Sequence, residues 1–333
     1  VDPGECLVLH LDFDPDATAI DADPWRPALR TRLPQRPPLG QRVFVALEEG
    51  GTLAVLDRRS GEVVQEIGVG GRPTDVVYSA LERRLLITVA GRDELVAVDL
   101  GDVDRIRRLP LRFGDEPSRL LLSDDEHDVF VLARGHDALV RVSNQTFQES
   151  GRIALEPRPV AMATDPRTGR VFVSSETSRA VEVVDPREQA VVERFVVRDV
   201  PGELVFLETS RELLVGALDA RSLERIDAGS GATVDSIELC GPVRGLATQR
   251  RSDRVFALLA ICDELSVLRP RLELEIATMA LPGRPGRGRL DPEERMLLVP
   301  MPDDDVLLQI NTIRTREMVV HEVGPRPVAV IVP

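Results

Sequence analysis

The fold is decided by a repeat that is clearest in residues 73–111, which read PTDVVYSALERRLLITVAGRDELVAVDLGDVDRIRRLPL. Turn-forming residues separate four short apolar runs, Thr74–Ser79, Leu85–Ala90, Glu94–Asp99 and Arg105–Leu111. The runs are rich in valine, leucine and isoleucine and are too short for helices. The stretch therefore predicts four antiparallel strands.

The same pattern recurs seven times, at a spacing of about 42 residues. One marker is the second residue of an apolar pair, found at Phe44, Leu86, Phe130, Phe172, Leu214, Phe256 and Leu298. A second marker is the proline that opens a first strand, found at Pro73, Pro117, Pro159, Pro201, Pro242, Pro285 and Pro327. Self-similarity at this period is typical of a repeat array or a propeller.

The two ends of the repeat region complement each other. The first repeat begins at its second strand, Val43–Leu47, and the chain finishes on a lone Pro-headed strand, Pro327–Pro333. An open solenoid would instead need capping repeats at both ends. We therefore predict an all-β fold, a seven-bladed β-propeller over residues 43–333 with four antiparallel strands per blade. The C-terminal strand should close the ring by pairing with the first blade.

Residues 43–333 resemble the YVTN-type seven-bladed β-propeller repeats of the bacterial periplasm and archaeal surface layers. The matching segments are 43–46 (VFVA), 53–57 (LAVLD) and 70–73 (GGRP). The sequence departs from the family pattern because no tyrosine opens a repeat and the asparagine is missing. The resemblance implies a binding or scaffold module, and it implies no enzyme activity.

Composition narrows the classes of partner. A net charge of −14 argues against nucleic acid and anionic membranes, since both attract basic surfaces. No apolar stretch approaches the ~18 residues that a transmembrane segment needs. All 42 basic residues are arginine. The chain opens on Val1 rather than methionine, which favours a leader that has been removed.

Residues 1–42 differ in composition and are predicted to form a separate acidic and proline-rich extension. Its acidic residues Asp12, Asp14, Asp16 and Asp23 fall at positions 1, 3, 5 and 12 of a calcium-loop pattern. The glycine that such a loop requires is replaced by Ala17. A weak calcium site and a solvated acidic turn therefore both stay open, and no other cofactor is predicted.

Arginine is concentrated where the Pro-headed strands begin, on what we call the proline face. These residues are Arg72, Arg119, Arg158, Arg244, Arg284, Arg287 and Arg326, while the strand that opens at Pro201 brings Glu203. Guanidinium groups at a channel mouth can bind an anion or the carboxylates of a partner. The loops between second and third strands lie on the same face and all carry carboxylates. The alternative is therefore that the arginines pair with these loops and hold the blades together.

Two cysteines are predicted to form a disulfide. Cys240 precedes the inner strand that opens at Pro242, and Cys262 ends the strand that pairs with it. The hairpin between them turns at about residues 251–253, which brings the two within two residues of direct opposition. A bond there would indicate an oxidising compartment, the periplasm or the cell exterior, and would leave Cys6 over.

The leading functional prediction is a non-enzymatic extracytoplasmic scaffold that docks a protein partner through the proline face or residues 1–42. The second is a lactonase-like or other small-molecule enzyme with an anionic ligand at the arginine-rich mouth, although the chain has only four histidines and no Gly-x-Ser-x-Gly motif. The third is a calcium-dependent cell-surface component. A pocket with a histidine or carboxylate among the arginines would favour the enzyme, and a flat charged face would favour docking.

Overall fold

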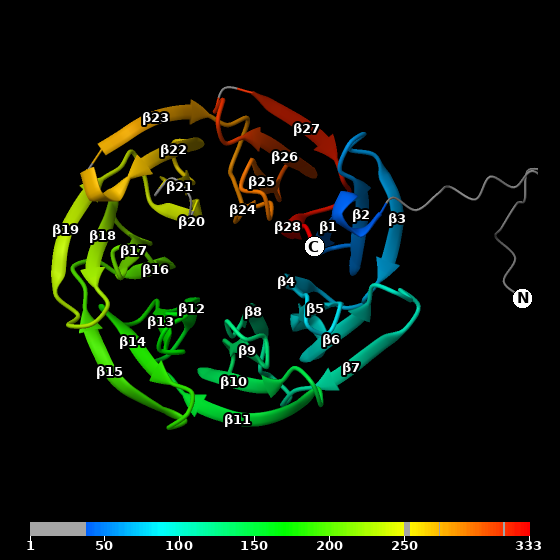
Figure 1. Ribbon diagram of the computed structural model, residues 1–333, viewed down its shortest axis with the longest axis horizontal. Coiled ribbons are helices and arrows are strands. Elements are labelled where there is room, and N and C mark those ends of the chain that lie inside the picture. The colour runs from blue at the N-terminus through cyan, green and yellow to red at the C-terminus, as the bar shows by residue number, and fades with distance from the viewer. Residues whose placement is uncertain (1–37, 250–253, 273, 316) are drawn as a thin grey trace, which may run out of the picture. The chain divides into compact units, whose positions relative to one another are not determined.

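The computed structural model describes residues 38–249, 254–272, 274–315 and 317–333. Seven four-stranded antiparallel sheets surround a central axis as blades, which confirms the predicted propeller (Figure 1). Helix within these ranges is limited to three 3-10 turns, η1 (Leu39–Gln41), η2 (Ala90–Arg92) and η3 (Pro270–Leu272). The predicted calcium ligands Asp12, Asp14, Asp16 and Asp23, together with Cys6, lie outside the described residues. The division of the chain at residue 42 stays a prediction.

Each blade runs from an inner strand at the axis to an outer strand at the rim. The inner strands are β4 (Pro73–Ser79), β8 (Pro117–Leu122), β12 (Pro159–Thr164), β16 (Pro201–Leu207), β20 (Val243–Gln249), β24 (Arg289–Leu290) and β28 (Pro327–Ile331). The second strands are β1 (Arg42–Leu47), β5 (Arg84–Val89), β9 (Asp128–Ala133), β13 (Val171–Ser175), β17 (Glu212–Ala217), β21 (Arg254–Leu259) and β25 (Met296–Met301). The third strands are β2 (Thr52–Asp57), β6 (Glu94–Asp99), β10 (Ala138–Ser143), β14 (Ala180–Asp185), β18 (Ser222–Asp227), β22 (Glu264–Arg269) and β26 (Val306–Asn311). The outer strands are β3 (Val63–Gly68), β7 (Ile106–Pro110), β11 (Gln148–Ala154), β15 (Ala190–Val196), β19 (Thr233–Glu238), β23 (Leu274–Ala280) and β27 (Met318–Glu322).

The ring closes as predicted, through the C-terminal strand. Strand β28 pairs antiparallel with β1, with Ala46 opposite Ala329 and Phe44 opposite Ile331, so the first blade has the order β28-β1-β2-β3. Closure matters because an unpaired β1 would leave its backbone N–H and C=O groups unsatisfied along an edge.

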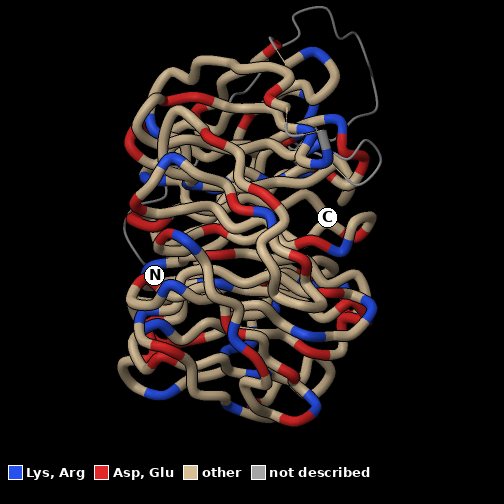
Figure 2. The backbone as a smooth tube through the Cα atoms, turned by 90° about the vertical axis from the view of Figure 1, so that its left-hand side faces the viewer, with Lys and Arg blue, Asp and Glu red and all other residues tan. Residues whose placement is uncertain are grey.

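The core lies between neighbouring sheets. Apolar residues of the repeat marker are almost fully buried, and one cluster joins Phe44 and Leu53 of the first blade to Ile87 of the second. The outer strands are mostly exposed, and their charged residues of both signs are interspersed over the side of the ring shown in Figure 2. The distribution of apolar and charged residues along each repeat therefore separates a buried apolar core from a charged outer surface.

The predicted turn chemistry is also present. The Oδ1 atom of Asp57, which ends β2, accepts hydrogen bonds from the backbone N–H groups of Arg59 at 2.8 Å and Ser60 at 3.0 Å. Asp227, which ends β18, accepts the same bonds from Gly229 and Ser230. These Asx turns fix the link from third to outer strand.

A β-bulge at the start of the inner strands determines which side chains face the axis. The register shifts between Pro73 and Asp75 in β4, and between Pro117 and Arg119 in β8. Because a bulge inserts one extra residue and re-aims the side chains beside it, it is a common device next to functional sites. Side chains placed two residues after the proline, including Asp75 and Arg119, thereby line the central channel.

The seventh blade departs from the repeat. Its inner strand β24 begins at Arg289 rather than next to Pro285, and it pairs with β25 at only two positions. The backbone N–H of Gly286 bonds instead to the carbonyl of Pro300 at 2.8 Å. A Cβ atom on Gly286 would lie 2.9 Å from that oxygen, so the approach requires glycine.

Candidate functional site

The axis of the ring is a channel made of three connected hollows. The hollow at the proline face, the proline mouth, has a volume of about 290 Å³, and the middle hollow has about 340 Å³. The hollow at the opposite face, which we call the opposite bowl, is the largest at about 590 Å³. The mouth and the middle share Arg119 and Glu203, and the middle and the bowl share Met162 and Arg289.

Ion pairs surround the rim of the proline mouth, both within a blade and between neighbouring blades. Glu48 follows β1 and contacts Arg326 of its own blade at 2.7 Å and Arg72 of the next blade at 3.7 Å. Glu176 follows β13 and contacts Arg158 at 2.6 Å. Arg72, Arg158 and Arg326 therefore pair with the acidic loops, as the alternative predicted, but only the contact of Arg72 joins two blades.

Inside the mouth, Arg119 and Glu203 form an ion pair across the channel. The Nε atom of Arg119 donates to the carbonyl of Val160 at 2.8 Å, while its Nη1 atom is buried and has no hydrogen-bond partner among the described residues. Burial raises the pKa of the Glu203 carboxyl, and the positive charge of Arg119 offsets this only in part.

Asp75 is the second carboxylate of the channel, and the sequence analysis did not single it out. It is 4% exposed and accepts hydrogen bonds from the backbone N–H groups of Val76 at 2.9 Å and Leu120 at 3.0 Å. Two arginines share it, with Arg287 Nη1 at 3.5 Å and Arg289 Nη2 at 4.0 Å. Asp75 could have been found from its position in the repeat, two residues after Pro73, because the residue at the same position in the next repeat is Arg119, which was predicted as a site residue.

Arg244 and Arg284 differ from the other predicted arginines because both are exposed and neither side chain makes a hydrogen bond or close ion pair with a residue that the structure describes; the charge of Arg244 still acts on Glu203. Arg244 lines the proline mouth together with Arg119 and Arg287. Arg284 lies in the loop before β24 and does not line the mouth. The structure thus brings Arg119, Glu203, Arg244 and Arg287 to one hollow and leaves Arg284 outside it.

The predicted disulfide is present on the proline face. Cys240 and Cys262 are bonded, with their Cα atoms 6.3 Å apart. The bulge in β20 between Val243 and Gly245 explains the alignment, because it shifts the pairing of β20 and β21 by one residue toward the cysteines. A bond at this position ties the link from the fifth blade to the sixth.

A histidine missed by the sequence analysis as a site residue lies farther out on the proline face. Asp115 is fully buried, and its carboxylate accepts a hydrogen bond from each Nη atom of Arg152 at 2.8 Å. The Nδ1 atom of His136 lies 3.0 Å from the Oδ1 atom of Asp115. Burial raises the pKa of Asp115, but the hydrogen bonds from Arg152, His136 and the backbone of Arg112 outweigh that effect and lower it. Because an ionised carboxylate only accepts, Nδ1 of His136 must carry the proton.

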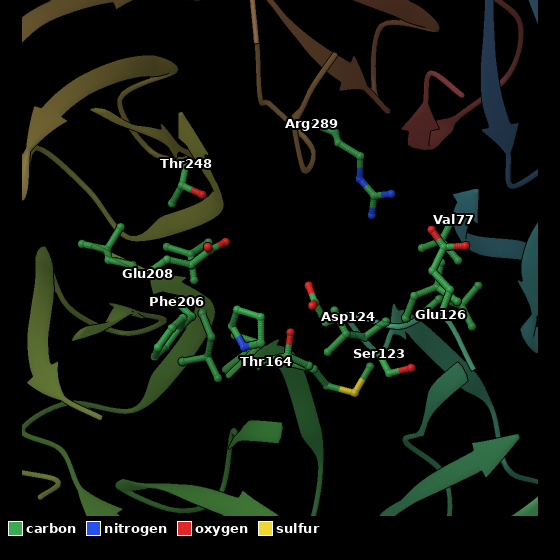
Figure 3. Close-up of a pocket in the computed structure, with 18 of the residues that line it drawn as sticks. Val77, Ser123, Asp124, Glu126, Thr164, Phe206, Glu208, Thr248 and Arg289 are labelled. Carbon is green, nitrogen blue, oxygen red and sulfur yellow. The ribbon is translucent and has the colours of Figure 1, made fainter. Parts of the chain in front are cut away.

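The opposite bowl was not predicted. Figure 3 shows side chains from most of the blades around an open space, with Arg289 and Thr248 on one side and Thr164, Phe206 and Ser123 on the other. Asp124 and Glu208 add carboxylates at its border. The bowl combines two arginines, Arg254 and Arg289, with apolar side chains and acidic groups, so it is chemically distinct from the proline mouth.

No helix of the described residues is long and apolar enough to span a membrane. The sequence matches no protein-family profile, and no curated protein matches it. The structure resembles a chain of Kuenenia stuttgartiensis hydrazine synthase, with 15% identity, a TM-score of 0.72, and coverage of 82% of this chain and 93% of that one. It also resembles virginiamycin B lyase from Staphylococcus aureus (12% identity, TM-score 0.67, coverage 77% and 87%) and a chain of the mitotic checkpoint complex (16%, 0.69, 80% and 82%).

Similarity at these identities shows the fold alone, because propellers named for enzymes and a propeller named for an assembly match equally well. The YVTN assignment stays a prediction. The chain is a seven-bladed β-propeller of the architecture shared by these proteins.

Proposed function

We propose that this protein is an extracytoplasmic binding module whose proline mouth receives an acidic segment of a protein partner. The observation that carries the proposal is Arg244, an exposed arginine that lines the hollow, makes no hydrogen bond or close ion pair with a described residue, and acts on Glu203 only through its charge. The neighbouring Arg119 adds a buried Nη1 atom that has no hydrogen-bond partner there either.

The charge balance around the axis supports an anionic occupant. Glu176 is contacted by Arg134 as well as by Arg158, and Glu48 likewise has two arginines. Each of these carboxylates can neutralise only one of its two cations. Four arginines and three glutamates line the mouth, so its lining has one positive charge in excess although the whole chain carries a net charge of −14. Such a local field attracts carboxylates and supports bidentate guanidinium contacts.

The disulfide supports an oxidising location, because bonds of this kind persist in the periplasm and outside cells. Calcium at Asp12, Asp14, Asp16 and Asp23 is not needed for the proposal and stays a separate hypothesis. Residues 1–42 also stay a possible second contact region.

The experiment compares Arg244→Ser with Arg284→Ser, since both arginines are exposed on the same face and make no close ion pair with a described residue, but only Arg244 lines the mouth. Binding of a fluorescent hexaglutamate peptide is measured by polarisation at 0.15 M salt. A charge-assisted hydrogen bond contributes about 1.5–3 kcal/mol, so Arg244→Ser should weaken binding about 10- to 100-fold. Arg284→Ser should change it less than twofold.

Equal losses in the two variants would show that the peptide senses only net charge, and the docking proposal would fail. Thermal unfolding of both variants on the same preparations checks that the fold is intact. Arg287 is unsuitable for the first test because it also donates to the carbonyl of Thr74 and contacts Asp75.

A small-molecule enzyme is the second candidate, and His136 is the observation that favours it. Its Nδ1 atom is held by buried Asp115, and the half-exposed ring adjoins a hollow of about 430 Å³ lined by Arg112 and Arg152. A histidine oriented by a carboxylate can act as a general base through Nε2, beside exposed Arg112, which could hold an anionic substrate. Hydrolysis of a lactone panel that disappears in His136→Gln but survives in Arg244→Ser would support the enzyme over the docking module.

A further inference from the structure

We propose that the opposite bowl binds a small zwitterion with an apolar body, such as a free apolar amino acid or a short apolar peptide. This site lies at the other end of the channel from the proline mouth and uses other charged residues. The proposal is therefore independent of the docking function.

The bowl has a fixed apolar wall on the side of the third to fifth blades. Leu122, Met162 and Phe206 line it and are each only partly buried, so they still offer surface to a ligand. Phe206 stacks on the buried ring of Phe172, with a centroid separation of 6.0 Å and an interplanar angle of 10°, which holds its orientation. A volume of about 590 Å³ is in the range of small-molecule pockets.

The opposite wall carries two arginines, of which Arg254 donates to the carbonyl of Thr312 at 3.2 Å and Arg289 is assigned to the ligand. Arg289 Nη1 donates to the carbonyl of Val76 at 3.1 Å, which anchors the guanidinium beside the axis. Its nearest carboxylate, Asp75, is 4.0 Å away and is already shared with Arg287 and two backbone N–H groups. One positive charge is therefore left over, and in Figure 3 the guanidinium points into the bowl. A carboxylate is the complementary group.

The ammonium end of the ligand is assigned to Asp124. Three acids follow one another at 124–126, and the structure uses two of them to hold loops. Asp125 accepts from Ser123 Oγ at 2.6 Å, and Glu126 accepts from the backbone N–H of Leu81 at 2.8 Å. Asp124 has no such partner among the described residues, is exposed, and points its carboxylate into the bowl (Figure 3).

The arrangement of charged and apolar side chains around the bowl indicates which class of ligand would fit. A free carboxylate group of the protein and a guanidinium face the same space, with apolar side chains beside them. A dianion would meet Asp124, and a dication would meet Arg289, so each would bring like charges together. A molecule with one charge of each sign and an apolar body satisfies all three surfaces.

The experiment is calorimetric titration of the full chain with leucyl-phenylalanine, its N-acetyl form and its C-terminal amide. The free dipeptide should bind at least about tenfold more tightly than either blocked form, since each block removes one charge-assisted contact. Asp124→Asn should abolish the preference for the free amine while keeping the preference for the free carboxylate. Arg289→Gln should do the reverse.

Asp104→Asn and Arg187→Gln are matched controls, because both residues are exposed, follow third strands on the same face, and do not line the bowl. They should leave all three affinities unchanged. Free phenylalanine and a tripeptide titrated in the same way report the preferred length.

The proposal is overturned if no probe binds at millimolar concentration, or if free and blocked dipeptides bind alike to the wild-type chain. It is also overturned if the control variants shift binding as much as Asp124→Asn does. Should Arg289→Gln fail to fold, the blocked ligands and Asp124→Asn still decide the question, since Asp124 is exposed and makes no hydrogen bond or ion pair with the described residues.

Discussion

Removal of residues 327–333 should eliminate most of the stability of the propeller. These residues contain β28, the strand that completes the first blade by pairing with β1. Without it, β1 would present an open edge at the axis, next to Val43 and Val45, which are almost fully buried in the intact ring.

The size of the effect follows from burial. Val330 is 2% exposed and Val332 is 5% exposed, and both belong to a cluster that also contains Leu298 and Leu307. Burying a valine contributes about 1.5–3 kcal/mol, so the two valines alone account for about 3–6 kcal/mol. Typical domains have only about 5–15 kcal/mol of net stability. We therefore expect the truncated chain to unfold at a much lower urea concentration and with lower cooperativity.

The assay is urea unfolding followed by circular dichroism. Tryptophan fluorescence is unsuitable because Trp25, the sole tryptophan, lies outside the described residues. Val330→Ala should cost about 2 kcal/mol, and Val328→Ala, which alters a partly exposed channel residue, should cost much less. A truncated protein with the same midpoint and slope as the full chain would refute closure by β28.

Three further predictions concern individual contacts. Cys240→Ser should lower the free energy of unfolding by about 3 kcal/mol, as expected for a loop of 22 residues, and peptide mapping without reduction that finds both cysteines alkylated would contradict the bond. Glu212→Ala should lower the free energy of unfolding by about 3–5 kcal/mol because it removes the bidentate partner of buried Arg225. The double variant Glu212→Leu with Arg225→Met should recover much of this stability. If the two substitutions instead lower the urea midpoint additively, the ion pair is not the cause. Since the pKa of Asp115 is lowered on folding, its contribution is complete above about pH 4 and is lost as the pH falls further. Asp115→Asn should therefore flatten the acid limb of a stability-versus-pH curve, and an unchanged limb would disprove the assignment.

The repeat predicted the fold well because each blade repeats the same solution to the same packing problem. The proline that opens β4, the buried Phe44 and the Asp57 turn are local features, and local features can be read one repeat at a time. Even the cysteine pairing followed from hairpin geometry, although the bulge in β20 that aligns the two residues was not foreseen.

The channel chemistry could be predicted only in part. The arginines of the channel were predicted from their enrichment at the starts of the inner strands. Whether each of them forms an ion pair depends on side chains that are distant in the sequence. Arg326 meets Glu48 across 278 positions, and Arg287 meets Asp75 across the channel. The opposite bowl was missed because its residues come from most of the blades and share no common type or spacing.

The short inner strand β24 has a consequence for the dynamics of the ring. It makes only two paired positions with β25, whereas β20 makes six with β21, so the seventh blade has the shortest ladder at the axis. Local opening should therefore begin there, and amide hydrogen–deuterium exchange should be faster at residues 287–290 than in β4 or β20. Arg287 and Arg289 both lie on this segment. Two of the cations that line the channel are thus carried by the segment for which we expect the fastest exchange with solvent.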